Sequence, residues 1–235
     1  NALPQDMLDL LYEVMDLSEE NVLEILCAKV DSYSANYIMM DWCPRQLELV
    51  SNASGESPRT NPSQVRESEC VTEIVGFINK MSRDSKKCMP SYLHKHLFSQ
   101  LFQHAADHIL QLLSCSAVSR FNLMSIVQLN TDLHFLKKVA ASTLEDSDVD
   151  VLFSNLMQVL EYLLSCIPES ILDPQVKMSL YPLVNTQMLG RLLCKYQEMP
   201  KDVSNSVQGS GMSFLSNAPT KATIDGVVEK LLNTL

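Results

Sequence analysis

The chain has 235 residues, of which 46% are hydrophobic and 6% aromatic, and its formal net charge at pH 7 is −10. The hydrophobic share is enough to build a sizeable core in one elongated domain or in two small ones. The negative charge opposes binding to nucleic acid or anionic lipid unless a local basic patch overrides it, and the low aromatic content is lean for a surface that stacks on bases.

Helical periodicity recurs along the chain, which contains only six glycines. Apolar residues three and four positions apart mark one face of a helix. In chain order, the expected helices cover residues 3–16, 18–33, 65–81, 91–114, 119–140, 149–167, 186–198 and 223–235. We therefore predict an all-α protein, an elongated antiparallel bundle of seven to eight helices.

The first two predicted helices are separated by a helix-start signal. Ser18 is followed by Glu19 and Glu20. Serine is a common N-terminal cap, and acidic side chains are stabilising near the positive N-terminal end of a helix. We accordingly assign residues 1–18 to the end of a preceding segment or a linker, and residues 19–235 to one C-terminal bundle. The inward stripe of the second helix is predicted to be Val22, Ile25, Leu26, Lys29 by its stem, and Tyr33.

Two polar stretches interrupt the helices. Residues 51–64 and 201–221 are rich in Ser, Asn, Gly and Pro, which is typical of flexible loops. Trp42, the only tryptophan, lies just before Pro44, where the chain leaves a helical segment. We expect this indole to anchor the turn to the core.

The hairpin of residues 119–140 and 149–167 dominates the pattern. Its second helix is apolar nearly all round, which predicts a central rod covered by other helices. Its first helix has a core stripe and also a second, mixed face, which consists of Leu123, Val127, Asn130, His134 and Lys137. Such a face suits a wet partner surface, and the alternative is a boundary face that a neighbouring helix of the same domain covers.

Sequence signals for catalysis are weak. Both Gly-rich phosphate-loop patterns are missing. His104 and His108 have the spacing of two metal ligands on one helix, but the HExxH pattern is absent, and a solvated face is the simpler interpretation. The seven cysteines are scattered without a CxxC pair, as expected of free, inert thiols in a reducing compartment. We predict no enzyme, no catalytic residue, no metal and no cofactor, with a metal-dependent enzyme as the rival.

Six motifs occur in an order that resembles the C-terminal part of the exocyst complex component six family. The most specific is residues 121–140, where Leu129, Asn130, Asp132 and Ala140 fall on the family's positions. The other five cover residues 25–42, 71–81, 152–164, 181–198 and 224–235. The chain departs from the pattern at Lys137 or Lys138, where the family often has glutamate, and at Met157, which replaces an arginine.

This resemblance implies a helical fold of the vesicle-tethering-complex type without catalysis. It also implies a GTP-loaded Rab GTPase and other exocyst subunits as partners, and no nucleic acid. The implied location is cytoplasmic and peripheral, reached through partners on secretory or recycling vesicles and at plasma-membrane sites of exocytosis. We expect the GTPase on the mixed face. The alternative is a helical scaffold of another membrane-traffic tether, which binds partner helices and no GTPase.

Overall fold

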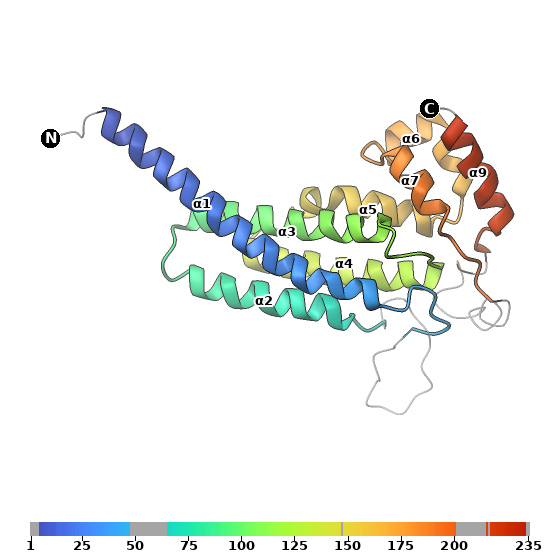
Figure 1. Cartoon of the computed structure of the whole chain (residues 1–235), viewed down its shortest axis with the longest axis horizontal. Helices are drawn as coiled ribbons and strands as arrows, with labels where there is room; N and C mark the ends of the chain where they lie inside the picture. The colour runs from blue at the N-terminus through green and yellow to red at the C-terminus, as the bar shows by residue number, and fades with distance from the viewer. Residues whose placement is uncertain (1–4, 48–64, 147, 201–214, 216, 234–235) are drawn as a thin grey trace, which may run out of the picture.

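The computed structural model describes residues 5–47, 65–146, 148–200, 215 and 217–233. Its elements are α1 (Gln5–Ser34), η1 (Ala35–Met39), α2 (Glu69–Ser85), α3 (Ser91–Ser114), α4 (Leu123–Leu144), α5 (Asp150–Leu164), η3 (Pro168–Leu172), α6 (Pro174–Leu180), α7 (Thr186–Leu193) and α9 (Lys221–Asn233). Helices α1 to α5 run alternately in opposite directions as an elongated bundle, and α6, α7 and α9 gather at one end (Figure 1). The predicted all-α bundle is confirmed.

The first helix is continuous, so the predicted helix start at Ser18 is wrong. The Ser18 hydroxyl donates to the carbonyl of Val14, one turn back in the same helix, instead of accepting from a backbone N–H ahead of it. Helix α1 therefore crosses the predicted boundary between residues 1–18 and 19–235 without a break. The division of the chain into those two parts stays a prediction.

The inward stripe of α1 also differs from the predicted one. Leu26 and Val30 are buried, whereas Val22 and Ile25 are exposed, the latter by 69%. Helix α1 packs against both α2 and α3. The buried residues of α1 are therefore those that face the groove between α2 and α3. They differ from the stripe that periodicity predicts.

The central helix is α3, not the predicted rod of residues 149–167. Helix α3 packs against α1, α2, α4, α5 and α7, and its large side chains Phe98, Leu101 and Phe102 are fully buried. Helix α5 packs mainly on α3 and α4. Its residue Val151 is 72% exposed, which shows that an apolar circumference does not guarantee burial on all sides.

Local capping explains where several helices begin. Ser68 accepts a hydrogen bond from the Val71 N–H, so α2 starts at Glu69 and not at Val65. Asn122 accepts from the Ser125 N–H in the same way, so α4 starts at Leu123 and not at Ser119. The stretch between the predicted helices of residues 149–167 and 186–198 contains η3 and α6.

Helix α7 ends earlier than predicted, at Leu193, because the next residues pair with a distant segment. The Phe121 N–H donates to the carbonyl of Lys195, and the Gln197 N–H donates to the carbonyl of Phe121. Phe121 and Tyr196 thereby form an isolated parallel β-bridge. It joins the α7 end of the molecule to the start of α4.

The segment after α1 is fixed to the start of α4 through Trp42. This indole is buried, and its Nε1 donates to the carbonyl of Tyr37 at 2.9 Å. The carbonyl of Trp42 accepts from the Asn122 N–H, also at 2.9 Å. The prediction that Trp42 anchors this turn is confirmed. The loop of residues 51–64 lies outside the described residues, as do 201–214 and 216 of the second loop.

A buried carboxylate, Asp132, joins α4 to two other segments. Its Oδ2 accepts from the hydroxyls of Tyr37 at 2.8 Å and Ser68 at 2.6 Å. Its Oδ1 accepts from the Ser68 N–H at 2.8 Å and from the amide of Gln128 at 3.2 Å. Burial raises the pKa of the Asp132 carboxyl, and these donors act in the opposite direction because they stabilise the charged form. One side chain thus ties η1, the cap of α2 and the middle of α4 together.

We expect Asp132→Ala to lower the free energy of unfolding by about 2–4 kcal/mol, because it leaves several buried donors without an acceptor. Tyr37→Phe is the matched control: it removes one donor while Oδ2 keeps its bond from Ser68, so the loss is about 1 kcal/mol. Denaturant melts of both variants measure this. A loss below about 1 kcal/mol for Asp132→Ala would show that the network contributes little.

We expect acidification to destabilise the fold through His94. This imidazole is buried, its Nε2 lies 3.1 Å from the Ser82 hydroxyl, and its ring stacks on Phe98. Burial, aided by the nearby Lys86, lowers the pKa of His94 below 6.5. The unfolded chain therefore binds the proton more tightly, so this contribution to stability is present above about pH 6.5 and lost as the pH falls below it. His94→Gln, which does not titrate, should flatten the decline of unfolding free energy between pH 7 and 5; an unchanged slope contradicts this.

We expect Leu160→Ala to cost about 2–5 kcal/mol of unfolding free energy, because this fully buried side chain lies where α5 meets the bundle. Val151→Ala on the exposed side of the same helix is the control, with an expected change within about 0.5 kcal/mol. Equilibrium unfolding in denaturant distinguishes the two. Equal losses would mean that α5 is not held by its inward face.

Candidate functional site

Two of the cysteines are held in their protonated form by their surroundings. All seven are free thiols. Burial raises the pKa of Cys27 and of Cys70 to about 11, with a further rise from Asp31 in the first case and Asp132 in the second. A thiol with such a pKa is almost fully protonated at neutral pH and reacts poorly. The expectation of inert thiols therefore holds for Cys27 and Cys70 and stays a prediction for the exposed Cys88 and Cys194.

His104 and His108 are not simply a solvated face, because both contact Asp31 across the α1–α3 interface. His104 Nε2 lies 2.7 Å from Asp31 Oδ1 and is hydrogen-bonded to it. His108 Nδ1 lies 2.9 Å from the same oxygen but is not aligned for a hydrogen bond. In the described part of the chain, no group of three or more His, Cys, Asp or Glu side chains is arranged to hold a metal ion. The cluster serves as a polar contact between two helices.

The five residues of the predicted mixed face do not share one environment. Leu123 and Val127 are buried in the core, so the expected apolar half of an exposed partner surface is not available on the molecule's outside. The physical reason is the packing of α4, which contacts α2, α3 and α5 and leaves only a narrow outward strip. The expectation that a neighbouring helix covers part of this face is therefore correct for these two residues.

The polar half of the mixed face lies at the surface. His134 is exposed and Asn130 is half-buried. Among the described residues, nothing forms a hydrogen bond with the Asn130 side chain, so it has no capping or bridging role there. Lys138, one turn beyond His134, is exposed and extends the strip. We call Asn130, His134 and Lys138 the outer face of α4.

Lys137 does not project freely into solvent, because it forms an ion pair with Asp150. Its Nζ lies 2.6 Å from Asp150 Oδ1 and 3.2 Å from the sulfur of Met157, and its side chain is only 18% exposed. The ion pair joins the end of α4 to the first turn of α5. Lys137 therefore borders the outer face of α4 and is less available to a partner than Asn130 or His134.

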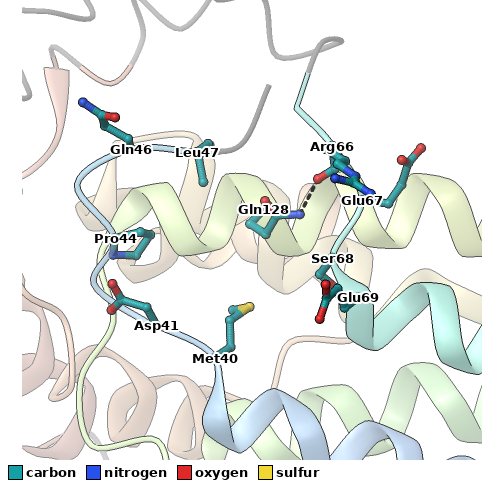
Figure 2. Close-up of a pocket in the computed structure, with 10 residues that line it drawn as sticks. All are labelled: Met40, Asp41, Pro44, Gln46, Leu47, Arg66, Glu67, Ser68, Glu69 and Gln128. Carbon is teal, nitrogen blue, oxygen red and sulfur yellow. Dashed lines mark hydrogen bonds between the residues drawn. The ribbon is translucent and has the colours of Figure 1, made fainter. Parts of the chain in front are cut away.

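An open pocket of about 270 Å³ lies beside the start of α4, where three segments meet (Figure 2). The chain after η1 contributes Met40 and Pro44, and the start of α2 contributes Ser68 and Glu69. Gln128 projects from α4 and donates to the carbonyl of Arg66 at 2.8 Å, as Figure 2 shows. Ser68, which lines the pocket, donates its hydroxyl to Asp132, so this hydroxyl belongs to the buried network described above. The sequence held no signal for this pocket, since its walls are distant along the chain.

Among the helices of the described residues, none combines the length and apolar character that crossing a membrane requires. No solved structure matches the chain.

The chain is similar to known proteins over most of its length. It is 22% identical over 207 residues to the protein named "Exocyst complex component 6" of Dictyostelium discoideum, an alignment that covers 84% of this chain and 19% of that protein. The chain thus spans about a fifth of the curated relative that it matches. Residues 5–195 match a family model, and because that match covers well over half of the chain, the chain belongs to the family described as Exocyst complex subunit Sec15 C-terminal.

Proposed function

We propose that this chain is a non-catalytic helical module of an exocyst subunit and that it helps to tether secretory or recycling vesicles to the plasma membrane. The observation that carries this proposal is the family match over residues 5–195. The all-α fold and the protonated, half-buried thiols of Cys27 and Cys70 are consistent with a protein that acts through its surfaces. In this role the chain is cytoplasmic, assembles with other exocyst subunits, and reaches membranes through its partners.

The finer proposal is that the module is an effector of a GTP-loaded Rab GTPase, bound on the outer face of α4. Support comes from the rigidity of this helix. Asp132 holds the inner side of α4 through four donors, and two positions earlier Asn130 points outward with its amide unused. A fixed amide that can donate and accept is suited to contact a partner without ordering cost.

The test is a pull-down of Rab GTPases loaded with a GTP analogue or with GDP. We expect binding that depends on GTP, and we expect Asn130→Ala to weaken it by about 1–3 kcal/mol while the melting temperature stays unchanged. Gln103→Ala, which removes an exposed amide from α3, is the matched control and should leave binding unaltered.

Binding to no Rab, or binding that ignores the nucleotide, would refute the effector role and favour a scaffold that binds partner helices. A loss of stability in Asn130→Ala would instead assign this residue to the fold. Unchanged binding and unchanged melting would move the GTPase site away from the outer face of α4.

A further inference from the structure

The N-terminal part of α1 extends past the ends of its neighbours (Figure 1). Several large apolar residues of α1 are exposed near this part of the helix. Val14 is 53% exposed, Met15 50% and Val22 41%. Large apolar residues gathered on one stretch of helix mark an interaction surface more often than scattered ones do. The proposed GTPase contact lies on α4 and does not use this stretch.

A groove of about 470 Å³ runs between residues 14–22 of α1 and the start of α3. Helix α1 lines it with Met15, Glu19 and Val22, and the opposite wall consists of Met89, Tyr92 and Leu93. From Met15 to Val22 the wall is about 10 Å long at the rise of an α-helix, which corresponds to about two turns of a bound helix. The groove thus has the size and apolar lining that receive anchors spaced i, i+3 and i+7.

Glu19 lines this apolar groove with a side chain that is 24% exposed. Oε1 of Glu19 is buried and makes no hydrogen bond. The nearest cationic candidate, His96 Nε2, is 3.6 Å away, and the amide nitrogen of Gln100 donates to that same ring nitrogen at 2.7 Å. At 3.6 Å this contact is too long for a hydrogen bond, so the Glu19 carboxylate keeps unused acceptor capacity. A poorly paired carboxylate on an apolar wall is suited to receive a donor from a ligand.

The rim of the groove is strongly acidic. Glu13, Asp16, Glu20 and Glu24 are exposed on α1, and residues 13–28 contain neither Lys nor Arg. Two copies of this chain joined through the groove would bring these acids together, which disfavours a homodimer. An anionic lipid surface is disfavoured for the same reason. The charge is complementary to a basic protein segment.

We propose that this groove is a docking site for an amphipathic helix of a partner protein, whose apolar face fills the groove and whose Lys or Arg donates to Glu19. The proposal is independent of the GTPase, because the two surfaces lie on different helices. Its ligand class is defined by chemistry: two turns of apolar anchors flanked by positive charge.

The test is a fluorescence-anisotropy titration of the whole chain with a synthetic helical peptide of about 15 residues, with Leu anchors and flanking Lys. A second peptide carries Glu in place of each Lys. We expect saturable binding of the lysine peptide and at least about tenfold weaker binding of the glutamate peptide. Val22→Lys, inside the groove, should weaken the lysine peptide by at least about tenfold.

Ile25→Lys is the matched control. It makes the same charge change at an exposed residue of the same helix that does not line the groove, and it should alter affinity by less than about twofold. Glu19→Gln should reduce the preference for the lysine peptide. The proposal is overturned by absent binding of that peptide, by equal losses in Val22→Lys and Ile25→Lys, or by a preference that survives Glu19→Gln. A dimer seen by light scattering and dissolved by Val22→Lys would assign the groove to a second copy and also overturn it.

Discussion

A single buried carboxylate holds the middle of the bundle in register. Asp132 lies on the inner side of α4 and accepts hydrogen bonds from η1, from the cap of α2 and from its own helix. Taking an ionised carboxylate out of water costs several kcal/mol, and the cost is offset only when donors surround it. The arrangement therefore requires Tyr37, Ser68 and Gln128 to be in place together, so the three segments form as one unit.

This constraint reaches the surface of the molecule. Asp132 and the apolar residues of α4 face inward together, so Leu123 and Val127 lie in the core while Asn130 is half-buried and His134 is exposed. Ser68 has two roles in the same network, since its hydroxyl donates to Asp132 and its oxygen also accepts from the first turn of α2. The residues that α4 turns inward thus determine which of its residues remain at the surface.

The two candidate interaction surfaces differ in physical character. The outer face of α4 is polar and lies on a helix packed against three others, so it presents fixed hydrogen-bonding groups. The groove beside α1 is apolar with an acidic rim, and one of its walls is a helix that extends past the bundle. A globular partner is suited to the first and a helix to the second, so one chain of this family could engage both at once.

Much of this protein was determined by the sequence alone. Periodicity identified the all-α class, and Ser91–Ser114 coincides with α3 because Pro90 precedes it and Ser114 ends a long apolar face. The ordered motifs identified the family before any contact was known. These features depend on neighbours within a few residues or on short patterns, and both are visible in a linear chain.

Tertiary structure alone decided which apolar residues are buried. Ile25 and Leu26 are equally hydrophobic neighbours, yet only Leu26 faces the groove between α2 and α3. The sequence gives no sign that Asp132 is buried. Its partners Tyr37 and Ser68 lie 95 and 64 positions away in the chain and meet it only in the folded structure. Helix α7 likewise stops because Phe121 pairs with Tyr196. In each case the deciding partner is distant along the chain, and periodicity within one helix carries no information about where the other helices pack.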